Sequence, residues 1–167
     1  MKHRKPLSRN FPKHHPRAGQ QTFFVEQIYN SLFEKEGDWS NAPGDASAYV
    51  VELNHFIEGL KHHTVRGGNR VKVGDLLQFY VWSGKPYRSK QINVTEYFEV
   101  KKTFDFVIDM LGGEYRMNGV EIPIEKLRLI ALNDGFTDLD DFECWFKLKK
   151  GEGFIGQIIC WNENVSY

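Results

Sequence analysis

Apolar residues recur at helical spacing in four segments of the chain. In residues 24–33, apolar side chains at i, i+1, i+4, i+5, i+8 and i+9 form one broad helical face: Phe24, Val25, Ile28, Tyr29, Leu32 and Phe33. Thr22 can cap this predicted helix, and Gly37 can end it. After a loop at 37–47, rich in Gly, Asp and Ser, a second helix is predicted over residues 49–60.

Two further helices are predicted in the last third of the chain. Pro123 suits the first turn of a helix, and the Asp134-Gly135 pair suits its end. Thr137 can cap a fourth helix, whose aspartates lie near the positive end of the helix dipole. We expect these apolar residues to face inward: Leu127, Ile130 and Ala131 in the third helix, and Leu139, Phe142, Trp145 and Phe146 in the fourth.

Strands are predicted where apolar and polar residues alternate. One strand covers residues 77–81, after a turn at 73–75, and another covers 99–109. Asn118-Gly119, between two short extended runs, is the strongest hairpin signal in the chain. A largely buried strand is predicted at 154–161. The order of elements predicts an α+β fold, in which the strands form a small, mostly antiparallel β-barrel with flanking helices.

The chain of 167 residues fits one domain with an additional segment. Residues 1–19 are predicted to be a flexible basic arm, because three prolines interrupt any helix and residues 1–17 hold six cations and no acid. Residues 20–167 are predicted to be a single domain, with a helical extension at 20–55. Because the whole chain has equal numbers of basic and acidic residues, the part after residue 17 is net acidic.

Composition narrows the functional classes. Apolar residues make up 41% of the chain, which is enough for a core and argues against global disorder. Lys and Arg number 22, as do Asp and Glu, so bulk charge alone would not hold this protein on nucleic acid. No apolar run is long enough to span a membrane, and no signal-peptide core follows the basic start. We expect a cytoplasmic protein with no membrane partner.

Cysteines and histidines do not suggest a metal centre. Cys144 and Cys160 match neither a zinc pattern nor a disulfide framework, and we interpret them as reduced thiols near the core. The adjacent histidines His62 and His63 would point in opposite directions on a strand, and no acid or thiol completes a site at ligand spacing. We therefore expect no metal and no cofactor.

The segment from Gly59 to Arg66 carries the first candidate binding residues. Lys61 is either an exposed lysine beyond a helix end or a desolvated general base. Thr64 is either a β-branched residue that starts a strand or a nucleophile activated by a neighbouring base. Arg66 shares a strand face with Thr64, and forms either a surface ion pair or a contact with a phosphate or base. The Lys61 side chain can lie on the same side as those of Thr64 and Arg66 only if the backbone bends. Gly59 and the Gly67-Gly68 pair permit such a bend.

Two other segments add candidates. Asp134 is either a turn residue or a group that accepts a base amino group or transfers a proton, and its neighbour Asn133 could read a base edge. In the polar segment 82–90, aromatic and basic residues alternate, as single-stranded nucleic acid requires. Its candidate ligand-binding residues are Trp82, Lys85, Tyr87 and Arg88. The alternative for that segment is an ordinary polar hairpin loop.

Four motifs in order resemble the ASCH family of the PUA-like superfamily. They are GLKHHTVR (59–66), VKVGDLLQFYVW, ALNDGFTDLDDFECWF and FIGQIICW, and the resemblance covers residues 56–161. It implies a β-barrel with flanking helices and a cleft where the 61–66 segment meets the loop before the Asp-Gly-Phe helix. It also implies binding of RNA or of modified bases.

One ASCH branch hydrolyses the acyl amide of N4-acetylcytidine with a Lys, a Thr and a Glu. The resemblance places these roles on Lys61, Thr64 and Asp134, and aspartate is one methylene shorter than the glutamate of the family. The leading hypothesis is therefore a domain that binds RNA or a modified nucleoside. The alternatives are a metal-free amidohydrolase acting on an N-acylated nucleobase, and a protein-interaction module with a vestigial cleft.

Overall fold

The computed structural model describes residues 1–33, 59–109, 113–146, 148 and 152–167. The predicted loop at 37–47 and most of the helix predicted at 49–60 lie outside these residues. In the described part of the chain, three helices and nine strands form an α+β fold, as the sequence predicts. No helix in that part is both long and apolar enough to cross a membrane.

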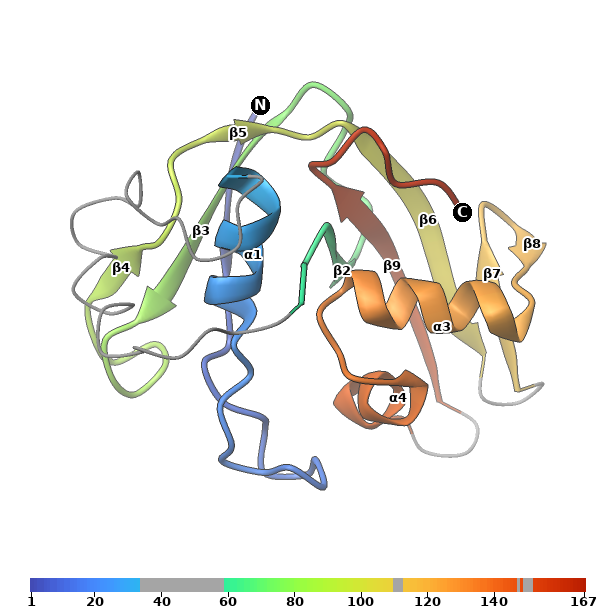
Figure 1. Cartoon of the computed structure of the whole chain (residues 1–167), viewed down its shortest axis with the longest axis horizontal. Helices are drawn as coiled ribbons and strands as arrows, with labels where there is room; N and C mark the ends of the chain where they lie inside the picture. Colours follow the sequence, from blue (N-terminus) through green and yellow to red (C-terminus); the bar gives the residue numbers. More distant parts are fainter. Residues whose placement is uncertain (34–58, 110–112, 147, 149–151) are drawn as a thin grey trace.

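The strands lie in two sheets (Figure 1). In the four-stranded sheet, β3 (Leu76–Trp82) pairs with β1 (Lys2–Pro6), β4 (Gln91–Asn93) and β5 (Phe98–Glu99). The strand β1 runs parallel to β3, and the other two pairings are antiparallel.

The five-stranded sheet is antiparallel throughout. Its order is β2 (His63–Gly67), β9 (Gly153–Cys160), β6 (Lys102–Asp109), β7 (Glu114–Met117) and β8 (Val120–Glu121). The predicted hairpin is confirmed, because Asn118 and Gly119 join β7 to β8 with φ angles of 52° and 80°. Two successive positive φ angles are what a tight two-residue hairpin turn requires.

The three helices begin near the positions that capping and periodicity predict, but one predicted cap is wrong. They are α1 (Phe24–Phe33), α3 (Ile124–Asn133) and α4 (Leu139–Phe146). The expected inward face of α3 is buried. Thr137, however, does not cap α4: the Asp138 carboxylate accepts the backbone N–H of Asp141 at 2.8 Å, and the Thr137 hydroxyl donates to the Asp141 carboxylate at 3.1 Å.

The core lies between the sheets and the helices. Figure 1 shows α1 beside the four-stranded sheet and α3 and α4 beside the five-stranded sheet. Across these layers the Tyr29 hydroxyl donates to the Val94 carbonyl, and the rings of Phe106 and Phe142 lie 6.2 Å apart. The last predicted strand is confirmed as β9, but Ile155, expected to be buried, is 76% exposed.

Residues 1–19, for which the sequence predicts a flexible arm, include a paired strand and buried side chains in the structure. Residues 2–6 are strand β1, and the buried side chains of Leu7 and Phe11 belong to the core. Proline interrupts helices, but it is tolerated at the edge of a sheet, and Pro6 is the last residue of β1, which lies at the sheet edge. In this segment, the prolines and positive charges are therefore part of an edge strand and its continuation.

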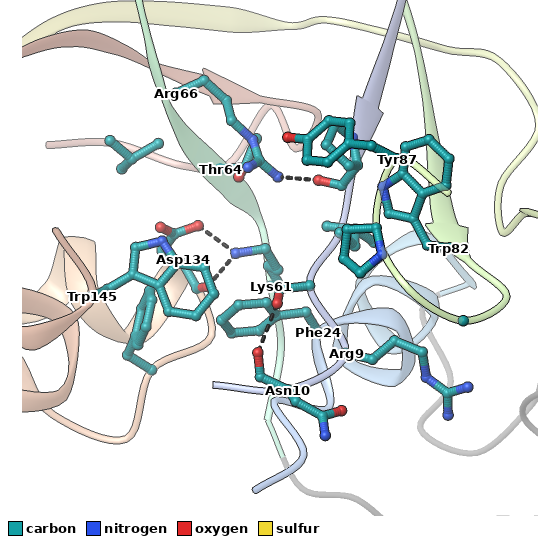
Figure 2. A pocket seen from close by; sticks show the side chains of 17 residues that line it. Arg9, Asn10, Phe24, Lys61, Thr64, Arg66, Trp82, Tyr87, Asp134 and Trp145 are labelled. Carbon is teal, nitrogen blue, oxygen red and sulfur yellow. Dashed lines mark hydrogen bonds and ion pairs between the residues drawn. The ribbon is translucent and has the colours of Figure 1, made fainter. Parts of the chain in front are cut away.

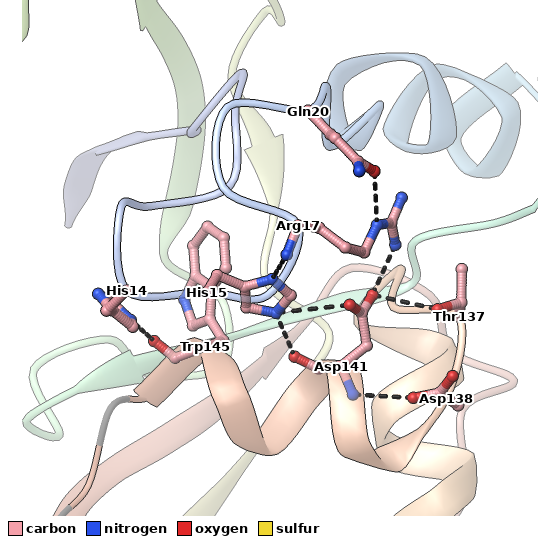
Figure 3. Close-up of polar contacts among 8 residues, drawn as sticks. All are labelled: His14, His15, Arg17, Gln20, Thr137, Asp138, Asp141 and Trp145. Atoms are coloured by element: carbon pink, nitrogen blue, oxygen red, sulfur yellow. Dashed lines mark hydrogen bonds and ion pairs between the residues drawn. The ribbon is translucent and has the colours of Figure 1, made fainter.

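Polar contacts fasten the segment after β1 to α4 (Figure 3). His15 is buried, and its Nε2 donates to the Asp141 carbonyl at 2.9 Å while its Nδ1 accepts the Arg17 backbone N–H at 3.1 Å. Arg17 Nη1 also lies 2.8 Å from the Asp141 carboxylate. These contacts fix the segment to α4. We therefore expect the first residues of the chain to stabilise the domain.

We predict that Phe11→Ala lowers the free energy of unfolding by about 3–5 kcal/mol. The Phe11 ring is 4% exposed, stacks on His15 at 4.4 Å and contacts the rings of Phe24 and Trp145, so its removal leaves a cavity. Urea unfolding followed by circular dichroism measures the loss. The control is Lys13→Ala, an exposed position expected to change stability by less than about 0.5 kcal/mol. Equal stabilities of the two variants would show that the segment does not contribute to the core.

Candidate functional site

A cavity of about 490 Å³ opens where the two sheets and the first segment of the chain meet. Its walls come from residues 6–10, the start of α1, residues 61–66, the end of β3 with the loop after it, and the region from Asp134 to Trp145. Figure 2 shows the side chains that line it. A cavity of this volume is large enough to hold a small organic ligand.

The cavity brings together six of the nine residues singled out as binding candidates, which are far apart in the sequence. They are Lys61, Thr64, Arg66, Trp82, Tyr87 and Asp134. Residues of the first three motifs that carry the family resemblance therefore line one cavity, together with Tyr87 from the segment 82–90.

The other three candidates do not line the cavity. Asn133 donates from its side-chain amide to the Tyr167 hydroxyl at 3.0 Å, so it braces the chain end rather than reading a ligand. Lys85 and Arg88 are exposed on the loop after β3. Asn133 shares the helix end with Asp134, but neighbouring residues on a helix point in different directions.

A bend before β2 turns Lys61 toward the cavity. Gly59 has a φ of +108°, a conformation that favours glycine. The backbone N–H of Lys61 donates to the Gln27 carbonyl at 3.1 Å, and that of His62 donates to the Asn133 carbonyl at 2.9 Å. Lys61 therefore lies ahead of the regular strand, which is how a residue three positions from Thr64 reaches the same cavity.

Lys61 and Asp134 form a buried ion pair at the centre of the site. Lys61 is 2% exposed, and its Nζ donates to both the carboxylate and the backbone carbonyl of Asp134. The Nζ also lies 4.3 Å from the centre of the Phe24 ring, within the range of a cation–π interaction.

Burial shifts the pKa values of both members of this pair toward their neutral forms. Loss of solvation lowers the pKa of Lys61 to about 8, although the Asp134 carboxylate opposes the shift. Burial likewise raises the pKa of Asp134 above its ordinary value, against the opposing effect of Lys61. The pair therefore presents both a proton donor and a proton acceptor, and both side chains are almost completely buried.

Thr64 and Arg66 occupy the same face of β2. Thr64 is 3% exposed, and Arg66 donates from Nη2 to the Pro6 carbonyl at 2.8 Å. The Nε of Arg66 is buried and has no hydrogen-bond partner among the described residues. A buried donor without a partner is unfavourable, so this group is available to an acceptor on a ligand.

Aromatic rings stand on both sides of the cavity (Figure 2). On one side Trp145 packs against Phe24 and Phe136, with each pair of ring centres 5.5 Å apart. On the other side Trp82 contacts Tyr87 at 5.4 Å. Trp145 was expected in the core, but it is half-buried and lines the cavity, because the apolar face of a helix looks the same in sequence whether it meets a core or a pocket.

Tyr87 has an unusual conformation for an aromatic residue. Its side chain is 84% exposed, and its φ is +64°, in the left-handed region that non-glycine residues rarely adopt. This backbone conformation holds a large ring at the mouth of the cavity instead of in the core. Such a residue points to a ligand-contacting role more readily than to a packing role.

The histidines beside Lys61 make contacts with other residues of the protein. His63 is buried, and burial holds its pKa well below the ordinary value, so the ring is neutral and its Nδ1 contacts the Tyr167 hydroxyl. His62 pairs with the Asn162 amide at 3.0 Å. The described residues contain no group of three or more His, Cys, Asp or Glu side chains that could hold a metal ion.

Comparison of the chain with protein-family models, with curated proteins and with solved structures finds no match. Function is therefore inferred from the cavity itself. A ligand must fit its two aromatic sides, its buried charged pair and the Arg66 Nε, which has no partner in the described part of the chain.

Proposed function

We propose that this protein is a PUA-like domain of the ASCH family that binds RNA or a nucleotide, with one nucleobase held in the cavity. The observation that carries this proposal is the convergence of Lys61, Thr64, Arg66 and Asp134 on a cavity with aromatic sides. The PUA-like barrel is part of the proposal. It is supported by the α+β class, by the mostly antiparallel strands and by the cleft between residues 61–66 and Asp134.

The aromatic residues suit the flat faces of a base. Stacking of a base on an aromatic side chain contributes about 1–3 kcal/mol and tolerates any base. Trp145 on one side, and Trp82 with Tyr87 on the other, offer rings at both sides of the volume that a base would enter (Figure 2).

The polar groups suit the edge of a base. The Asp134 carboxylate can accept a hydrogen bond from an exocyclic amino group, while Lys61 and Arg66 Nε can donate to a ring nitrogen or a carbonyl. These groups are already ordered by contacts within the protein, so a ligand need not immobilise them. Unstacked bases offer such edges in single-stranded RNA, but a duplex hides them.

The total charge of the chain and the placement of its basic residues agree with a small contact with the ligand, rather than with a broad basic surface that binds nucleic acid. The total charge is zero, and the basic residues near the N-terminus are held by the fold: Lys2 lies over Tyr97 and Arg4 over Tyr80. Lys85 and Arg88 remain exposed beside the cavity and could contact phosphates.

We place the protein in the cytoplasm, where thiols such as the buried Cys160 stay reduced.

We predict that Trp82→Ala and Trp145→Ala each weaken binding of short single-stranded RNA by roughly tenfold, since each removes one stacking surface. Fluorescence anisotropy with labelled oligonucleotides of each base at low salt measures the affinity. Trp82→Phe, which keeps an aromatic face, should retain most of the binding. Tyr97→Ala, an aromatic residue that does not line the cavity, is the control. Binding unchanged in both tryptophan variants, with circular dichroism showing intact folds, would refute the nucleobase cavity.

A second candidate function is hydrolysis of an N-acylated nucleobase. It is favoured by the lowered pKa of Lys61, about 8, and by the presence of Thr64 and Asp134 in the same cavity. In this reaction neutral Lys61 takes the proton of the Thr64 hydroxyl, and the oxygen attacks the acyl carbon. The C–N bond then breaks, the base amino group leaves with a proton, and water hydrolyses the acyl-threonine ester.

The observed contacts favour binding over this reaction. Lys61 donates to two oxygens of Asp134, whereas a general base for Thr64 must have lost a proton. The shorter side chain of Asp134, relative to the glutamate of the family, also changes where its carboxylate lies.

If the protein is an amidohydrolase, incubation with N4-acetylcytidine releases cytidine at a rate that rises with pH through about 8. The rise follows the lowered pKa of Lys61, because only the neutral amine accepts the proton. Chromatography of the products measures it. Thr64→Val and Lys61→Met should abolish turnover, and Thr64→Ser should keep part of it. No turnover by the unaltered protein, or turnover that survives Thr64→Val, rejects this mechanism.

A further inference from the structure

Arg66 has unused capacity to bind an anion. One of its terminal nitrogens, Nη2, donates to the Pro6 carbonyl at 2.8 Å, while Nε is buried and unpartnered among the described residues. Asp134 attracts Arg66 through space, but the Asp134 carboxylate is already paired with Lys61. A guanidinium that is fixed at Nη2 and still has an unused donor at Nε among the described contacts is well suited to an oxygen of a carboxylate or phosphate.

Two more cations, which do not line the cavity, belong to the same electrostatic environment. Lys5 precedes Pro6, whose carbonyl holds Arg66, and Arg70 follows Arg66 after the exposed turn at 67–69. Burial lowers the pKa of the half-buried Lys5, and the charges of Arg66 and Arg70 lower it further. Lys5 is therefore repelled by both arginines when no anion is bound.

The surface around this cluster is open. Arg70 and the turn residues Gly67, Gly68 and Asn69 are exposed, and a side chain added at Gly68 would meet nothing within 4 Å. An anion from solution can therefore reach Arg70, whose charge acts on Lys5 together with that of Arg66.

We propose that Lys5, Arg66 and Arg70 form a phosphate subsite at the edge of the cavity, so that the ligand is a nucleotide, free or within a strand, rather than a nucleoside. This inference rests on the proposed function, because the base of the same ligand occupies the cavity. Arg66 belongs to both parts: it lines the cavity, and its charge acts on Lys5. The phosphate relieves the repulsion that Arg66 and Arg70 exert on Lys5, and it supplies the acceptor that Arg66 Nε lacks among the described residues.

The test compares nucleosides with their monophosphates. Calorimetric titrations at low salt use adenosine, cytidine, guanosine and uridine, each against its 5′- and 3′-monophosphates. For the base that binds, we expect one monophosphate to bind roughly tenfold more tightly than the nucleoside, as a hydrogen bond between charged groups allows. Lys5→Ala and Arg70→Ala should each remove part of this advantage, and the double variant most of it, with nucleoside affinity unchanged.

Arg128→Ala is the matched control, since Arg128 is an exposed arginine on α3 that does not line the cavity. Equal affinities for nucleoside and monophosphates, or an advantage that survives in the Lys5→Ala/Arg70→Ala double variant, would overturn the phosphate subsite and leave the nucleobase cavity standing. If neither nucleosides, monophosphates nor short RNA bind the unaltered protein, the proposed function fails, and the phosphate subsite fails with it.

Discussion

The buried ion pair between Lys61 and Asp134 is the contact on which the site depends. It joins the bend before β2 to the end of α3, two segments separated by more than seventy residues of chain. Both groups have given up water, and an ammonium or carboxylate buried alone is strongly unfavourable. Each member is therefore tolerated only because the other is present, and the two segments are held together at the centre of the cavity.

Three features of the site surround this pair. The aromatic rings of Phe24 and Trp145 lie beside the pair, so the cavity has an apolar side next to a charged centre. Thr64 and Arg66 share the cavity because β2 starts just after the bend that orients Lys61. Arg66 then faces Pro6 at the end of β1, which makes the first segment of the chain part of the site. A nucleobase with its phosphate is a ligand whose flat faces, polar edge and charge would match these three features.

Local sequence patterns predicted the elements with local causes. The apolar stripes of α1 and α3 and the Asn118-Gly119 turn follow from residues a few positions apart, and the structure confirms them. Strand β1 was missed because it is short, charged and stabilised by β3, which lies about seventy residues away. Among the candidate site residues, Lys61, Thr64, Arg66 and Asp134 come from motifs in the sequence, and the structure brings them to one cavity. The cavity lining includes Trp145, for which the sequence predicts a core position, and does not include Asn133, because residue spacing does not show which side of a helix meets a cavity.

A double-mutant cycle on Lys61 and Asp134 tests the central claim most directly. Urea unfolding at pH 7 compares the unaltered protein with Lys61→Met, Asp134→Ala and the double variant. We expect each single change to lower the free energy of unfolding by about 3–5 kcal/mol, because it leaves one buried charge without its partner, and the double change to lower it by much less than the sum. Small, additive losses would contradict the account, because they would mean that the two side chains do not depend on each other.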